Sequence, residues 1–281
     1  MRKMKRTVTL ISVFLVALAS LTGCGSKEDE ETKTTELVTV QTTEETTEAT
    51  TEATTEATTE AVSNEIISGE RTFVKTDGSH KDGTTTLTYG GHATVKIVAA
   101  DGTVIYVDPN YRDADYSDPA DIVLVTHGHD DHTPCSNLQV KDDTTTITWK
   151  EAHPDPDVYE TFEIGNIQIE AVPASNSNHS IKSCVGYIIF VDGIKIYHAG
   201  DTSMLDTMGD LAGKEIDFAL YPIDGSYNMD AEEATEVANL VNAKYNIPIH
   251  EFDVGNVRKS DNFLPKSRLV LEYGDTIVIS E

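Results

Sequence analysis

The chain has 281 residues and a formal net charge of −27, with 48 acidic and 21 basic residues. A surface this acidic repels polyanions at long range, which argues against nucleic acid as a partner. Residues 1–23 hold four basic residues and no acid, and residues 24–65 hold two lysines and twelve acids, so residues 66–281 carry the remaining −21. The length allows one large domain or two small ones.

Residues 1–23 are expected to form a signal peptide and not part of the fold. A basic start precedes an apolar run from Val8 to Ala19, which is too short to span a membrane comfortably and has no basic flank beyond it. The segment ends in Leu21-Thr22-Gly23-Cys24, which resembles the lipobox of bacterial lipoproteins. The resemblance implies cleavage before Cys24 and a lipid on its sulfur; the alternative is an incidental cysteine. We expect an extracellular protein that is anchored through Cys24 to the outer face of the cytoplasmic membrane.

Residues 24–65 are expected to form a disordered, acidic tether. The Thr-Thr-Glu-Ala repeat from Thr46 to Ala61 has no aromatic and almost no aliphatic side chains, so it cannot bury a core. Like charges extend such a segment, which would hold the folded domain away from the lipid surface.

Residues 66–281 are predicted to form one domain that is rich in strands. Residues 66–67 and 72–74 can add an edge strand, and residues 94–98 and 104–107 flank the turn Asp101-Gly102, which is typical of a hairpin. The continuous apolar run over 121–125 predicts a buried strand.

Directly after this run comes the segment Thr126-His127-Gly128-His129-Asp130-Asp131-His132-Thr133. In an extended loop His127 and His129 point the same way and can reach one ion, and Asp131 and His132 can face a second ion if the chain turns. Imidazole and carboxylate without thiolate suit zinc, iron or manganese in a catalytic site. The alternative is a solvated polar turn.

The second part of the chain repeats the pattern of strand, turn and strand. We expect strands over 144–149, 162–164, 167–172, 185–191, 194–199 and 247–250, and two more within 268–280. A short helix is expected over 203–209 and a longer one over 230–243, where Asp230 can cap the helix and Glu233 can complete a capping box.

Three further candidate ligands fall at the ends of predicted strands. His179 follows strand 167–172, Asp201 follows strand 194–199, and His250 ends strand 247–249. Each alone is a weak signal, because a histidine or aspartate in a loop is more often an ordinary hydrogen-bonding residue. Together they supply what a site for two metal ions needs after the first segment.

The arrangement of these residues over 85–281 resembles the metallo-β-lactamase superfamily. The segments Tyr197–Thr202 and Pro222–Asp230 are similar to its small single-domain branch, which includes ascorbate-6-phosphate lactonase-like proteins. The resemblance implies an α/β (α+β) fold, a four-layer αββα sandwich. It is trimmed here in its first half, because the chain between His132 and Thr144 is too short for the long helix that usually follows the motif.

The resemblance also implies a ligand set. His127, His129 and His179 would hold one divalent ion, Asp131, His132 and His250 would hold a second, and Asp201 would bridge the pair. Zinc is favoured, with manganese or iron as alternatives, and the two ions would share a hydroxide as the nucleophile.

Other residues are placed around this site with less support. Asp131 could orient the hydroxide, and His92 matches a position near the metals, although a histidine that packs a turn explains it as well. Tyr227 could reach a substrate oxygen. Asp108 could accept a hydrogen bond from a ligand imidazole.

The remaining histidines and cysteines are assigned no catalytic role. His198 is predicted to be interior, and His80 and His153 are predicted to lie on the surface. Cys135 and Cys184 are either two free thiols, which we favour slightly, or a disulfide in an exported domain.

The sequence therefore predicts a metal-dependent hydrolase of a small-molecule ester or lactone. A phosphodiesterase is the alternative within enzymes, and a surface metal-binding or sensing protein without turnover is the alternative outside them.

Overall fold

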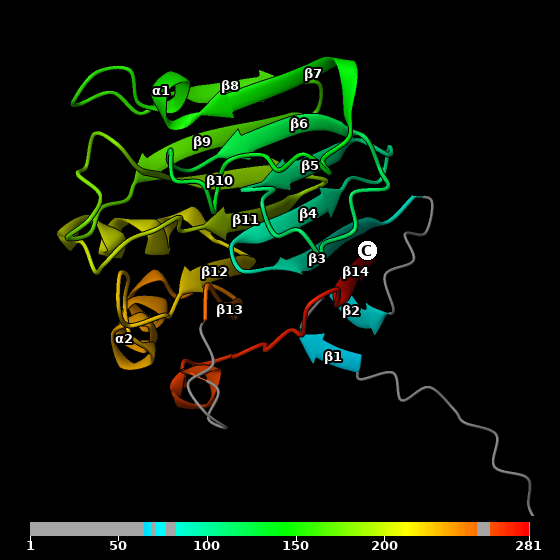
Figure 1. Cartoon of the computed structure of the whole chain (residues 1–281). Helices are drawn as coiled ribbons and strands as arrows, with labels where there is room; N and C mark the ends of the chain where they lie inside the picture. Colours follow the sequence, from blue (N-terminus) through cyan, green and yellow to red (C-terminus); the bar gives the residue numbers. More distant parts are fainter. Residues whose placement is uncertain (1–64, 69–70, 77–82, 252–258, 281) are drawn as a thin grey trace, which may run out of the picture. The chain divides into compact units, whose positions relative to one another are not determined.

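The computed structural model describes residues 65–68, 71–76, 83–251 and 259–280 (Figure 1). The chain divides into two compact units, residues 1–58 and 59–281, and every described residue belongs to the second. The predicted signal peptide, Cys24, almost all of the predicted tether and His80 lie outside the described residues. In the described part of the chain, the helices are too short or too polar to cross a bilayer.

The first sheet has eight strands, in the order β1-β2-β14-β3-β4-β5-β6-β7. Their bounds are β1 Glu65–Ser68, β2 Arg71–Thr76, β3 Thr85–Gly91, β4 Thr94–Val98, β5 Val104–Val107, β6 Ala120–Val125, β7 Val140–Thr148 and β14 Thr276–Ser280. The predicted hairpin is β4 and β5, which pair antiparallel, and the predicted buried strand is β6, which runs parallel to β5. The C-terminal strand β14 lies between β2 and β3.

The second sheet has six strands, in the order β13-β12-β11-β10-β9-β8. Their bounds are β8 Thr161–Ile164, β9 Ile167–Pro173, β10 Val185–Val191, β11 Ile194–His198, β12 Phe218–Pro222 and β13 Tyr245–Ile249. Strands β8 to β11 form antiparallel hairpins, whereas β11, β12 and β13 are parallel neighbours. Parallel neighbours place their carboxyl ends at one edge of the sheet, which becomes important for the site.

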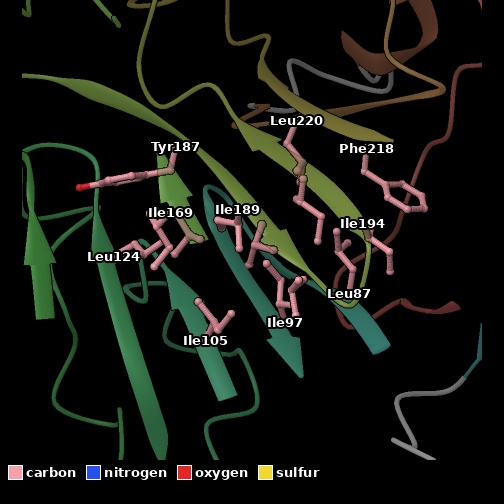
Figure 2. Close-up of a cluster of buried hydrophobic side chains, with 14 of the residues drawn as sticks. Leu87, Ile97, Ile105, Leu124, Ile169, Tyr187, Ile189, Ile194, Phe218 and Leu220 are labelled. Carbon is pink, nitrogen blue, oxygen red and sulfur yellow. The ribbon is translucent and has the colours of Figure 1, made fainter. Parts of the chain in front are cut away.

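The main hydrophobic core lies between the two sheets, and Figure 2 shows side chains from both meeting there. Strand β12 shows how one strand serves two layers, because its side chains alternate between opposite faces. Phe218 and Leu220 join the core between the sheets, while Ala219 and Tyr221 join a second cluster on the other face.

That second cluster is covered by the α-helix α2, Ala231–Val241, and by the 3₁₀ helix η1, Asp206–Lys214. Asp230 caps α2 as predicted, since its carboxylate accepts hydrogen bonds from the backbone N–H groups of Glu232 and Glu233. The capping box is not completed, because the Glu233 carboxylate accepts instead from the N–H of Met204. The short helix expected over 203–209 is η1, which begins three residues later and ends at Lys214.

In the described residues, the outer face of the first sheet is covered mainly by loops. Tyr116, Cys135 and Leu138, from the segments after β5 and β6, pack on Tyr106 and its neighbours there. Trp149 of the short helix α1, Trp149–Ala152, also packs there, whereas the short 3₁₀ helix η2, Lys259–Asn262, lies next to α2. The fold is therefore the predicted sandwich of two mixed sheets, with the helical layer of its first half reduced to loops.

Two further expectations need correction or refinement. Only β14 forms within 268–280, because Arg268 makes a single isolated bridge to Asn246 and starts no second strand. The edge strand expected over 66–74 is a hairpin of β1 and β2, and β1 begins at Glu65, one residue before the predicted start of the domain.

Candidate metal centre

The predicted site residues meet where strands of both sheets end. His127, His129, Asp131 and His132 follow β6, and the other three follow β9, β11 and β13: His179, Asp201 and His250. The loop after β6 is joined to the second sheet by a bridge between His127 and Cys184. It is also braced by Asn110, whose side-chain amide donates to the carbonyls of Asp130 and Thr133.

His127, His129 and His179 form what we call the three-histidine group. Each offers a ring nitrogen, and these atoms lie within 4.8 Å of one another. His179 Nε2 and His129 Nδ1 lie 3.0 Å apart. His127 and His179 are buried, whereas His129 is exposed.

His92, Asp131, His132 and His250 form what we call the mixed group, with ligand atoms again within 4.8 Å of one another. His92 Nε2 lies 3.2 Å from Asp131 Oδ2, and its ring packs on that of His250 with centroids 3.8 Å apart. His92 thus lies beside the predicted ligands, and its catalytic role stays a prediction. It lies at the β3–β4 connection with a φ of 53°, and its carbonyl accepts from the N–H of His250.

Asp201 lies between the two groups. Its Oδ2 is 3.9 Å from His127 Nε2, and its Oδ1 is 3.4 Å from His132 Nε2 and 3.5 Å from His250 Nε2. Among the described residues, His127 Nε2, His132 Nε2 and Asp201 Oδ1 are buried and have no hydrogen-bond partner. Buried polar atoms without partners are costly, and imidazole nitrogens facing a carboxylate oxygen are a donor set that a divalent cation satisfies. The residues present therefore fit a metal.

Two buried aspartates stand behind the imidazoles. Asp108 accepts from His132 Nδ1 at 2.7 Å, as the sequence led us to expect, and also from the backbone N–H and hydroxyl of Thr126. Asp224, whose Oδ2 lies 3.2 Å from His250 Nδ1, has no role in the sequence-based prediction. Its position two residues after β12 is the same strand-end signal that indicated Asp201 and His250.

These surroundings shift the pKa of several groups in the metal-free protein. Burial, helped by repulsion from His132, lowers the pKa of His127 to about 3, so this imidazole is neutral and available as a ligand. Burial also lowers the pKa of His132, but attraction and hydrogen bonding from Asp108 outweigh it and raise that pKa to about 9. The hydrogen bond from His92 lowers the pKa of Asp131, which is therefore ionised at neutral pH.

The site opens into a cavity of about 530 Å³. It is lined by His129, Asp131, Asn178, His179, Asp201, Tyr227 and His250. Tyr227, a predicted substrate contact, is 58% exposed at this cavity. Asn178 was not predicted, because nothing distinguishes it from other polar residues of its loop.

The other histidines and cysteines can now be placed. His198 is interior, as predicted, with Nε2 bonded to the carbonyl of Ala93. The prediction that His153 lies on the surface is wrong: it is buried, its Nδ1 bonds the carbonyl of Val158, and its ring stacks on Tyr159. Cys135 and Cys184 are free thiols, and burial raises the pKa of Cys184.

Gly200 places Asp201, and its replacement is expected to destabilise the fold. It has a φ of +65°, and an added Cβ would lie 2.6 Å from the carbonyl oxygen of Val185. Gly200→Ala should therefore cost about 2–4 kcal/mol of the free energy of unfolding, measured by urea denaturation. Gly213→Ala is the matched control, because nothing lies within 4 Å of its Cβ position. Equal urea midpoints for the two variants would contradict this account of the turn.

Comparison with known proteins decides the family. The model of the β-lactamase superfamily domain matches residues 86–250, which is more than half of the chain. The chain belongs to the β-lactamase superfamily. The match begins in β3 and ends at His250, so it spans both groups and Asp201.

Individual proteins similar to this chain are metal-dependent hydrolases. The chain is 32% identical over 193 residues to a UPF0173 metal-dependent hydrolase of Thermococcus onnurineus, covering 57% of this chain and 81% of the relative. A UPF0173 metal-dependent hydrolase of Methanoregula boonei is 33% identical over 185 residues, covering 58% and 81%. A solved structure from Parabacteroides distasonis, assigned as a metal-dependent hydrolase, is 29% identical with a TM-score of 0.56, covering 66% of this chain and 91% of that one. With the His/Asp groups, these relatives make the protein a metal-dependent hydrolase of this superfamily.

Proposed function

We propose that this protein uses two divalent metal ions to hydrolyse a small-molecule ester or lactone. The observation that carries the proposal is the convergence of the three-histidine group and the mixed group on Asp201. Three of the converging atoms, His127 Nε2, His132 Nε2 and Asp201 Oδ1, are buried without a hydrogen-bond partner among the described residues. His127, His129 and His179 would hold one ion, Asp131, His132 and His250 the other, and Asp201 would contact both. Imidazole and carboxylate donors favour zinc, with manganese or iron as alternatives.

The chain's own residues would position the nucleophile and the substrate. When bound, the ions supply a nucleophile at neutral pH and stabilise negative charge that develops on the substrate oxygen. Asp131, ionised and facing the cavity, would accept a hydrogen bond from the attacking water, while His92 Nε2 holds the Asp131 carboxylate in place. The Tyr227 hydroxyl at the cavity would bind a substrate oxygen.

The cavity favours a small substrate. Its volume of about 530 Å³ is in the range of small-molecule sites. The residues lining it in the described part of the chain include two aspartates and no lysine or arginine. The net charge of −21 over residues 66–281 argues against a nucleic-acid phosphodiester as substrate, and the similarity of Tyr197–Thr202 and Pro222–Asp230 to lactonase-like proteins supports a lactone.

The experiment that tests this function compares two adjacent aspartates. The full chain, loaded with zinc, is assayed on a panel of lactones, aryl esters and phosphodiesters. Asp131→Ala should lower kcat/KM at least about 10²-fold, because the water loses its acceptor and the metal a ligand. Asp130 is also exposed but does not line the cavity, so Asp130→Ala is the control, and its kcat/KM should stay within about 3-fold of that of the parent. A zinc-loaded parent that hydrolyses none of the panel would favour a metal-binding protein without turnover.

We propose in addition that Cys24 carries a lipid that anchors the protein to the outer face of the cytoplasmic membrane. The support is the segment Leu21-Thr22-Gly23-Cys24 after a basic and apolar start. In the native host, Cys24→Ala should move the protein from the membrane fraction to the soluble or secreted fraction. An unchanged distribution would refute the anchor and leave the proposed activity standing.

A further inference from the structure

Two histidines of the mixed group, His132 and His250, are backed directly by carboxylates. His132 Nδ1 bonds Asp108 Oδ2 at 2.7 Å, and His250 Nδ1 faces Asp224 Oδ2 at 3.2 Å. Asp108 and Asp224 are both fully buried. In each ring, Nδ1 is directed to a carboxylate, which leaves Nε2 facing Asp201. A carboxylate behind a ligand imidazole fixes the ring and raises its basicity.

The buried histidines of the three-histidine group are backed by neutral groups instead. His127 Nδ1 lies 3.1 Å from the hydroxyl oxygen of Thr126. That hydroxyl gives its one proton to Asp108 Oδ2 at 2.7 Å, so its oxygen accepts from His127. Asp108 therefore supports His132 directly and His127 only through a hydroxyl.

The same relation holds around Asp224. His179 Nδ1 bonds the Asn176 side-chain oxygen at 2.9 Å, Asn176 Nδ2 donates to Asn228 Oδ1 at 2.7 Å, and Asn228 Nδ2 donates to Asp224 Oδ2 at 2.7 Å. Two amides thus separate His179 from the carboxylate that His250 faces directly. Asp108 and Asp224 therefore each contact one histidine of the mixed group directly and one histidine of the three-histidine group only through intervening neutral groups.

The charge of the two groups is unequal as well. The mixed group contains the carboxylate of Asp131, whereas the three-histidine group contains no carboxylate of its own. Asp201 is close to both groups, so its charge does not distinguish one group from the other. A divalent cation in the mixed group would therefore have three nearby carboxylates besides Asp201. Two of them, Asp108 and Asp224, are buried, and buried charges are weakly screened.

We propose that the two metal positions are unequal and fill in order: the mixed group binds its divalent ion more tightly, and the three-histidine group releases its ion first. Asp108 and Asp224 are the positioning residues that set this order. The inference rests on the proposed dinuclear site, but it concerns affinity and is read from metal binding alone.

The test is stepwise removal of zinc from the full chain with chelators of increasing strength, followed by elemental analysis. We expect two steps, separated at least about 10-fold in chelator strength, with an intermediate of about one ion per chain. His179→Ala, from the three-histidine group, should lose the weak step and keep the tight one. His250→Ala, from the mixed group, should lose the tight step. Release in one step, or the reverse assignment of the two variants, would overturn the proposal.

A second set of variants tests the carboxylate. Asp224→Asn keeps the shape of the side chain but removes its charge, and should weaken the tight step about 10–100-fold, with partial recovery in Asp224→Glu. Asn228→Ala interrupts the amide path to His179 and also removes a donor to Asp224 Oδ2, so it should weaken the step of the three-histidine group more than the tight step. A loss of structure alone would move both steps together and would count against the assignment. Two-step binding without hydrolysis would refute the proposed function and leave this inference standing. Hydrolysis by a protein whose two sites bind metal equally would refute this inference and leave the proposed function standing.

Discussion

Asp201→Asn is expected to reduce kcat/KM by about 10³-fold or more and to lower the metal content of the purified protein. Among the described residues, Asp201 is the carboxylate that approaches both the three-histidine group and His132 and His250. Replacing one of its oxygens by an amide nitrogen removes the charge that two cations would share. Elemental analysis and the hydrolysis assay measure both effects on one preparation.

The same variant should not weaken the metal-free fold. Asp201 Oδ1 is buried without a hydrogen-bond partner among the described residues, and it faces His132 Nε2 at 3.4 Å. The cost of burying its charge offsets the attraction to His132, so the charge contributes little net stability when no metal is present. Chelator-treated Asp201→Asn should unfold at the same urea concentration as the treated parent, or a higher one. Asp210→Asn, at an exposed aspartate of η1, is the control for activity. A variant that keeps two ions and full turnover would remove Asp201 from the site.

Unlike Asp201→Asn, Asp108→Ala is expected to destabilise the metal-free protein, by about 3–5 kcal/mol. Asp108 is fully buried and accepts from the backbone N–H and hydroxyl of Thr126 and from His132 Nδ1. Its removal leaves three buried donors, one of them on a histidine with a raised pKa, without their acceptor. Urea denaturation of chelator-treated protein measures the loss.

Asp113→Ala is the matched control for Asp108, since Asp113 is an exposed aspartate of the following loop and should change stability by less than about 0.5 kcal/mol. A loss below about 1 kcal/mol in Asp108→Ala would show that the network around Thr126 is not a stabilising one. The contrast between Asp108 and Asp201 separates a residue that supports the fold from one that serves only the cations.

Local patterns in the sequence predicted most of the strands. The continuous apolar run of β6 and the hairpins around Gly102 and Gly193 are signals contained within a few residues, and each appears in the structure. Candidate ligands were predictable for a related reason. Four of them fall in the six positions 127–132, directly after a buried strand, and the others follow strands whose ends could be located.

Features that depend on distant pairing were not predicted. The place of β14 between β2 and β3 joins the two ends of the domain, and no local pattern encodes that pairing. Asp224 was missed because its partner His250 lies on the next parallel strand, 26 residues away in sequence, and only the order of β12 and β13 brings the two together. His153 was misplaced because a polar neighbourhood in sequence does not reveal the Tyr159 ring that covers it.

Metal content together with turnover tests the central claim most directly. The full chain, purified without chelator, is analysed for zinc, manganese and iron by elemental mass spectrometry and assayed on lactones and esters before and after removal and return of the metal. The account predicts about two ions per chain, with hydrolysis that is lost on removal and restored on return. A protein that binds no ion after dialysis against each metal, or that hydrolyses its substrate equally well without one, would contradict it.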